Sequence, residues 1–229
     1  AVADILYKND WNKNNHDAIS DELRLWCCTY LNRGFGSMFY QWIANAINKP
    51  YNSYGNGALM RISPVAKYAV KHNLSIDKAL EIAEQITSVT HNHPEALLAV
   101  KIYIEILIEL LINKNLLLQE KKEVIIQILK KYNYSMPKEI IQYRVNMDFD
   151  LTCKTSLLIA ISSIIETETL EDVFYQVVSV GGDSDTYAAI AGALGEAIYG
   201  ITPEFLINIK PYFKTYDEDI LLSLENLYN

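Results

Sequence analysis

The sequence contains few residues that could cross-link the chain. Only three cysteines occur among 229 residues, Cys27, Cys28 and Cys153, and no pair has the CxxC spacing of a structural zinc site. The odd count also argues against a disulfide framework. We therefore expect a reducing compartment and predict a cytoplasmic protein.

Positive charge is also scarce. Twenty lysines and arginines stand against 28 aspartates and glutamates, a net charge of −8, and the basic residues are scattered along the chain. Binding to nucleic acid or to a membrane surface requires clusters of basic residues. Composition therefore excludes both as general roles, and it makes no prediction of the oligomeric state.

No apolar run is long enough to cross a membrane. The longest, "LLAVKIYIEILIELLI" at 97–112, is interrupted by Lys101, Glu105 and Glu109 at intervals of four. This spacing places the three charges on one stripe of a helix, where Lys101 and Glu105 can pair. It predicts an amphipathic core helix rather than a membrane span.

Period-two alternation and hinges rich in proline, glycine or serine are also missing. Apolar residues instead recur at spacings of three and four, which is typical of helices. The sequence therefore predicts an all-α fold and one compact domain over residues 1–229. The segments expected to be helical are 21–33, 38–49, 77–89, 97–112, 122–132, 155–166, 170–180 and the residues after 186.

Helix starts are marked by capping residues. Ser75 precedes one apolar periodic segment, and Pro94 stands where a first-turn proline is favoured in the next. Thr169 is followed three residues later by Asp172, a pattern that resembles a capping box. These residues predict the positions of three helix N-termini.

Three segments that connect the expected helices differ from them in composition. They are rich in glycine, asparagine, histidine and hydroxyl residues, and such loops on a rigid scaffold commonly carry functional sites. They are "NSYGNGALMR" at 52–61, "TSVTHNHPEA" at 87–96 and "GGDSDT" at 181–186.

The segment "GGDSDT" places two carboxylates two residues apart. Asp183 and Asp185 can converge only if the backbone turns there, which Gly181 and Gly182 permit. With the hydroxyl of Thr186 they form a hard oxygen set suited to Mg²⁺, Mn²⁺ or Ca²⁺. The alternative is that one of the acidic or hydroxyl residues only caps the following helix.

The helix expected after this turn contains Gly192 and Gly195. Each glycine inside a helix costs roughly 1 kcal/mol relative to alanine. We therefore expect a neighbouring helix to pack closely against this one and to hold the acidic turn rigidly.

The other two segments allow more than one interpretation. Gly55 and Gly57 flank Asn56 and permit positive φ, so the backbone there can approach phosphate or sugar oxygens, or can form an ordinary turn. His91 and His93 have spacing that could bind a metal, but a helix cap and a solvated side chain are the plainer interpretation.

Taken in order, five segments resemble the ADP-ribosylglycohydrolase family, which includes the dinitrogen-reductase-activating enzymes. The resemblance runs over nearly the whole chain, and the last segment is the most specific. The segments are "RGFGSMFYQWI", "YGNGALMRISPVA", "TSVTHNHPEA", "CKTSLLIAI" and "GGDSDTYAAIAGALGEAIYG" followed by "ITPE".

The resemblance implies an all-helical, orthogonal multi-helix domain with two Mg²⁺ ions in a cleft. It implies a hydrolase that removes ADP-ribose from a modified side chain or a related acceptor, which the sequence does not specify. The metal ligands would be Asp183, Asp185 and Thr186. The residues at the ADP-ribose would be Tyr54, Gly55, Asn56 and Gly57, with Met60 and Arg61 supporting that loop and His91 and Asn92 at the other end of the ligand.

Two further residues, Cys153 and Ser156, would lie near the cleft, although Leu157 and Leu158 stand where relatives often have a Val-Pro step. The mechanism implied is metal-assisted attack of water at the anomeric carbon of the ribose, with a carboxylate assisting proton transfer.

One departure from the family affects the metal site. The family's Thr-Asp-Asp-Thr motif precedes a helix resembling "AVADIL", at which this sequence begins, and the closest acidic segment by composition is "DFD" at 148–150. Three alternatives stay open. The chain is an N-terminally truncated enzyme with one Mg²⁺ or none, a non-catalytic ADP-ribose-binding module, or a structural member of the same fold.

Overall fold

The computed structural model describes residues 1–31, 33–46, 48–144, 150–216 and 218–228. The regular secondary structure of these residues is helical, apart from an isolated antiparallel bridge between Gly55 and Thr152, which confirms the predicted all-α class. The helices are α1 (Val2–Lys8), α2 (His16–Thr29), α3 (Ser37–Asn45), α4 (Gly57–Met60), α5 (Pro64–Lys71), α6 (Ile76–Ser88), α7 (Pro94–Ile112), α8 (Leu118–Lys131), α9 (Ile141–Arg144), α10 (Cys153–Glu166), α11 (Leu170–Val180), α12 (Ser184–Tyr199), α13 (Pro203–Tyr216) and α14 (Glu218–Tyr228).

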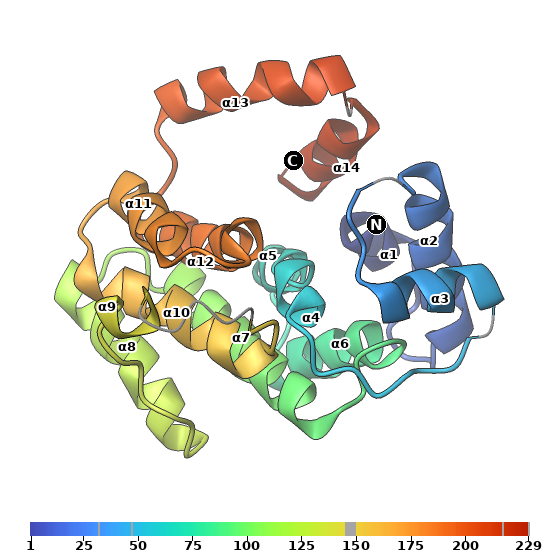
Figure 1. Cartoon of the computed structure of the whole chain (residues 1–229), viewed down its shortest axis with the longest axis horizontal. Helices are drawn as coiled ribbons and strands as arrows, with labels where there is room; N and C mark the ends of the chain where they lie inside the picture. The colour runs from blue at the N-terminus through green and yellow to red at the C-terminus, as the bar shows by residue number, and fades with distance from the viewer. Residues whose placement is uncertain (32, 47, 145–149, 217, 229) are drawn as a thin grey trace.

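Helix α7 lies at the centre of the fold. It packs against α5 and α6 on one side and against α8, α10 and α12 on the other, and Figure 1 shows it among these helices. Most of its circumference is apolar, which is typical of a helix buried on several faces. None of the described helices combines the length and hydropathy needed to span a membrane.

The charges of α7 follow one stripe of the continuous helix, as predicted, but Lys101 and Glu105 pair with other helices. Glu105 is buried and accepts hydrogen bonds from Lys131 Nζ and the Tyr132 hydroxyl, both at 2.6 Å. Lys101 pairs instead with Glu84 of α6, at 2.6 Å. The predicted pair between Lys101 and Glu105 is therefore wrong, because neighbouring helices cover α7 on both sides and supply its charged partners.

The predicted helix caps are present. The Ser75 hydroxyl accepts from the Lys78 N–H at 3.2 Å, and the Thr169 hydroxyl accepts from the Asp172 N–H at 3.1 Å. Pro94 occupies the first turn of α7. Local capping therefore sets these three helix starts.

The two glycines of α12 allow the close packing that was expected. A Cβ atom at Gly195 would lie 2.6 Å from Leu170 Cδ1, and one at Gly192 would lie 3.1 Å from Phe174 Cζ. Leu170 and Phe174 belong to α11, which packs along α12 together with α10. This packing holds the N-terminus of α12, which follows the acidic turn.

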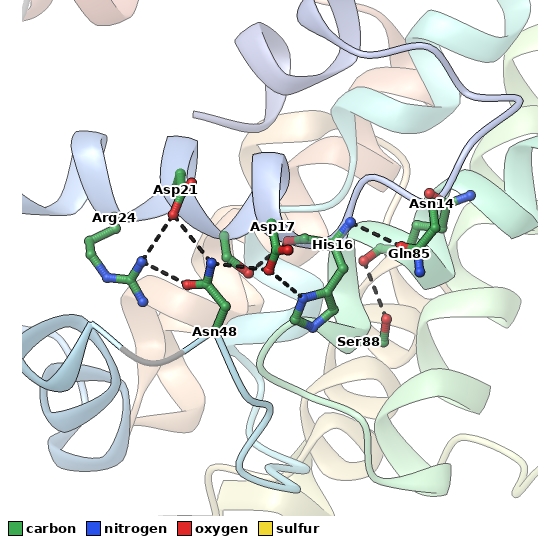
Figure 2. Close-up of polar contacts among 9 residues, drawn as sticks. Asn14, His16, Asp17, Asp21, Arg24, Asn48, Gln85 and Ser88 are labelled. Atoms are coloured by element: carbon green, nitrogen blue, oxygen red, sulfur yellow. Dashed lines mark hydrogen bonds and ion pairs between the residues drawn. The ribbon is translucent and has the colours of Figure 1, made fainter.

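The C-terminal helix α14 packs against α1 and α5, so the first and last helices lie side by side. Figure 1 shows α13 running along the edge of the molecule between α12 and α14. Polar contacts fix the segment after α3 to α2 (Figure 2): Asn48 accepts from Arg24 at 2.9 Å and donates to Asp17 at 3.2 Å. This segment leads directly to residues 54–57, which we call the glycine turn.

We expect Gly195→Val to lower the free energy of unfolding by about 2 kcal/mol, because its methyl groups overpack the contact with Leu170. Ala189→Val is the matched control, since Ala189 is exposed on the same helix and the change costs only about 0.5 kcal/mol of helix propensity. Urea unfolding measures both. Equal losses would contradict close packing at Gly195.

Candidate functional site

The glycine turn is joined by its backbone to the start of α10. The Asn56 N–H donates to the Leu151 carbonyl at 2.7 Å, and the Cys153 N–H donates to the Tyr54 carbonyl at 2.9 Å. The predicted loop is partly helical, because α4 begins at Gly57. The turn therefore has a fixed position relative to α10.

The turn uses its glycines for space rather than for positive φ. Gly55 and Gly57 are not among the positive-φ glycines of the described chain, which corrects the expectation from the sequence. A Cβ at Gly57 would lie 3.5 Å from His91 Nε2, and one at Gly55 would lie 3.3 Å from the Ser53 hydroxyl. The absence of side chains at these two positions lets Ser53 and His91 pack closely against this backbone.

The side chain of Asn56 connects the glycine turn to the acidic turn. Its Nδ2 donates to Asp183 Oδ2 at 2.7 Å and to the Ser156 hydroxyl at 3.0 Å. Asn56 is buried, with 7% of its surface exposed. Segments 127 residues apart in sequence therefore meet through one amide group.

The acidic turn has the predicted backbone. Gly181 and Gly182 have φ of 79° and 65°, which favour glycine, and α12 begins directly after Asp183. Asp183 is the N-cap residue but makes no side-chain capping bond. Its carboxylate instead accepts from Asn56, so the capping alternative does not describe Asp183.

The other two candidate metal ligands lie in the first turn of α12. Asp185 is exposed, whereas Thr186 is buried. Among the described residues no group of three or more histidine, cysteine, aspartate or glutamate side chains is placed to hold a metal ion. Two carboxylates and a hydroxyl nevertheless suit Mg²⁺, which commonly takes one or two carboxylates and completes its shell with water.

The acidic segment at 148–150 contributes to the start of α10. Asp150 accepts from the Thr155 hydroxyl at 2.6 Å and from the Thr152 N–H at 2.9 Å. Burial raises the pKa of Asp150, but these hydrogen bonds outweigh burial and the net pKa is lowered. Asp150 thus holds Thr152, the N-cap residue of α10, as an ionised acceptor, while Asp148 lies outside the described residues.

His91 is buried between the glycine turn and Arg61. Its Nδ1 lies 2.7 Å from the Thr90 hydroxyl and 3.1 Å from an Arg61 terminal nitrogen, which also donates to Thr90. Burial, assisted by the Arg61 charge, lowers the pKa of His91 to about 2. The imidazole is therefore neutral at physiological pH.

The residues after His91 support the loops. Asn92 Oδ1 accepts from the Asn52 N–H at 2.8 Å, and His93 Nδ1 accepts from the Glu95 N–H at the start of α7. The cap interpretation of His93 is therefore correct. Tyr54 is half-exposed, with its ring centroid 5.1 Å from that of His93, so an aromatic pair borders the glycine turn.

Cys153 lies at the turn as a protonated thiol. Its Sγ donates to the Gly55 carbonyl at 3.0 Å, and burial raises its pKa to about 12. A thiol in that state is a poor nucleophile. Cys153 therefore stabilises the turn instead of attacking a substrate.

Of two hollows in the structure, one adjoins the acidic turn and the other does not. One of about 300 Å³ lies behind the acidic turn and is lined by Gly181, Gly182, Asp150 and Tyr187, among others. Another of about 820 Å³ lies between α6 and the segment 12–16, beside His16 and Gln85 in Figure 2. The larger hollow contains none of the predicted site residues, and among its charged groups Lys101 pairs with Glu84.

The family model for ADP-ribosylglycohydrolase matches residues 1–209, which include the glycine turn, His91 and the acidic turn. The chain belongs to the ADP-ribosylglycohydrolase family. A solved structure titled "ADP-ribosylglycohydrolase-related protein complex" is 20% identical, with a TM-score of 0.68 over 99% of this chain and 78% of that chain. At this identity the likeness shows the fold. A search of curated proteins gives no match.

The structure brings most of the predicted site residues of this ADP-ribosylglycohydrolase family member together. Asn56, Ser156 and Asp183 share hydrogen bonds, and His91 faces Gly55 and Gly57. Sequence reasoning missed Thr90 as a partner of His91, and it named Arg61 only as a support. The signal that could have indicated both is the single charge of Arg61 among the apolar residues of "ALMRISPVA".

We expect Asn56→Asp to lower the free energy of unfolding by about 3 kcal/mol at pH 7, because it turns a buried donor into a second carboxylate facing Asp183. Burial and Asp183 raise the folded-state pKa of the new carboxyl. The loss is therefore largest above that pKa, shrinks as pH falls toward about 4, and disappears below it, where the carboxyl is protonated in both states.

Urea unfolding at both pH values measures this effect. Asn92→Asp is the matched control, since Asn92 serves as an acceptor from the Asn52 N–H and a carboxylate can replace it. A similar loss in both variants, or one independent of pH, would contradict the donor role of Asn56.

Proposed function

We propose that this chain binds ADP-ribose over the glycine turn and, with Mg²⁺ at the acidic turn, hydrolyses the bond between ADP-ribose and an acceptor group. The observation that supports this proposal most is the hydrogen bond from Asn56 to Asp183. This bond joins two features in one site. One is a backbone suited to sugar and phosphate oxygens, and the other is a carboxylate suited to a divalent cation.

The metal would be held by Asp183, Asp185 and Thr186. Asn56 binds one oxygen of Asp183, Oδ2, and the other is not used in a hydrogen bond to a described residue. When bound, Mg²⁺ would supply Lewis-acid stabilisation of ribose hydroxyls and of an attacking water. The amide of Asn56 orients Asp183 for this task, much as outer-shell partners orient ligands in other metal sites.

The remaining residues would bind and orient the ligand. Gly55 and Gly57 have no side chain of their own to keep a ligand from the backbone, and His91 Nε2 lies beside the position that a Cβ of Gly57 would take. Arg61 adds a positive charge behind His91, without a salt bridge to any described carboxylate. A nearby cation favours an anionic ligand such as a diphosphate.

A second candidate function is binding of ADP-ribose without hydrolysis. It is favoured by the small number of acidic groups, because the described part of the chain has no cluster of three metal-binding side chains. The acceptor, whether arginine, serine, a base or a small molecule, stays open in both cases. Turnover distinguishes the two functions.

We expect calorimetric titration to detect ADP-ribose binding to the wild-type chain, tighter with Mg²⁺ than with a chelator, and we expect Asn56→Ala to weaken it about tenfold or more. Hydrolysis of ADP-ribosyl-arginine and ADP-ribosyl-serine peptides is assayed in parallel. Binding with turnover supports the hydrolase, and binding alone supports the second function. No binding by the folded chain would contradict both.

We expect Mg²⁺ at about ten times its dissociation constant to raise the melting temperature by about 3 °C, since binding stabilises the folded state. The double variant Asp183→Asn with Asp185→Asn should lose this response, because amides are weaker ligands than carboxylates. Glu171→Gln is the matched control, as it removes a first-turn carboxylate from α11. An unchanged response in the double variant would overturn the metal assignment.

A further inference from the structure

Arg61 and His91 share a hydrogen bond whose direction chemistry fixes. The Arg61 terminal nitrogen lies 3.1 Å from His91 Nδ1, and a guanidinium nitrogen donates but cannot accept. Nδ1 must therefore carry a lone pair rather than a proton. In a neutral imidazole this places the single ring proton on Nε2.

The protonated nitrogen lies beside the backbone of the glycine turn. Nε2 lies 3.5 Å from where a Cβ of Gly57 would be and 3.8 Å from that of Gly55. His91 is 5% exposed, and Nε2 has no hydrogen bond to a described residue. This nitrogen is not among the fully buried polar atoms of the described residues without a partner, so a ligand or a water molecule can reach it and accept its proton.

We propose that Arg61 is a positioning residue that holds His91 in its Nε2–H tautomer, so that His91 presents a neutral donor to an acceptor atom of a ligand over Gly55 and Gly57. The inference deepens the proposed function and rests on it for the identity of the ligand. An oxygen of a sugar or diphosphate has the matching chemistry.

The surroundings of His91 keep this arrangement constant. The groups that face it are Arg61, the Thr90 hydroxyl and the ring of Tyr51, 5.8 Å away between centroids. Burial raises the pKa of Tyr51 to about 12, so that its hydroxyl stays neutral. The Arg61 charge beside Nδ1 opposes protonation of the imidazole, and the guanidinium also lies 5.7 Å from the centre of the Phe39 ring.

The first test is a long-range ¹H–¹⁵N spectrum of the wild-type chain with labelled histidine, with His91 assigned by loss of its signal in His91→Gln. We expect a protonated Nε2 and an unprotonated Nδ1, unchanged between about pH 5 and pH 8. Addition of ADP-ribose should shift the Nε2–H signal. A protonated Nδ1, or a mixture of tautomers, would overturn the proposal.

The second test is Arg61→Met, in which we expect the His91 signal to become a mixture of tautomers or to titrate, with ADP-ribose affinity lowered about fivefold to tenfold. If Arg61 acted on the ligand only through its charge, Arg61→Met would weaken the binding of an anionic ligand without changing the tautomer of His91. Arg24→Met is the matched control, because Arg24 also stacks on an aromatic ring, 4.5 Å from Trp42. An unchanged His91 spectrum in Arg61→Met would overturn the role of Arg61.

A third variant covers the case in which Arg61→Met does not fold. Thr90→Val removes only the hydroxyl beside Nδ1, so the Nε2–H tautomer of His91 should persist. Loss of that tautomer in Thr90→Val would show that Thr90 determines it, and would overturn the proposal. These spectra need no ligand. A wild-type chain with the expected tautomer that fails to bind ADP-ribose would therefore contradict the proposed function while leaving the tautomer control by Arg61 intact.

Discussion

The site depends on one buried amide. Asn56 Nδ2 has two protons, and they satisfy Ser156 on α10 and Asp183 before α12 at the same time. A leucine or alanine at this position would leave a buried hydroxyl and a carboxylate without their donor. The backbone bridge between Gly55 and Thr152 adds a second attachment, so the glycine turn, α10 and α12 keep a fixed relation.

The sequence predicts much of this arrangement, because the strongest signals are local. Hydrophobic periodicity and capping residues locate helices such as α6, α7 and α11. The glycines of α12 indicate that another helix packs closely against it. The pairing of Lys101 fails because its partner, Glu84, belongs to another helix. The bond from Asn56 to Asp183 cannot be read from local pattern either, since it joins residues 127 positions apart; only the resemblance to the family placed both in one site.

Electrostatics divide the site into two parts of opposite sign. Asp183 and Asp185 make one end negative, whereas Arg61 makes the region behind His91 positive. A buried cation without a carboxylate partner is unfavourable in a protein interior, and here its costs are offset by bonds to Thr90 and His91 and by contact with Phe39. An anionic ligand that bridges to a divalent cation would complement both ends.

The division also explains why His91 is neutral. A charged imidazole next to Arg61 would place two cations together in a buried space, and both burial and Arg61 lower its pKa, to about 2. A neutral imidazole donates from one nitrogen while the other nitrogen accepts. The hydrogen bond from Arg61 to Nδ1 therefore leaves Nε2 as the donor. Arg61 therefore determines which atom of His91 can donate to a ligand, although Arg61 itself lies behind His91.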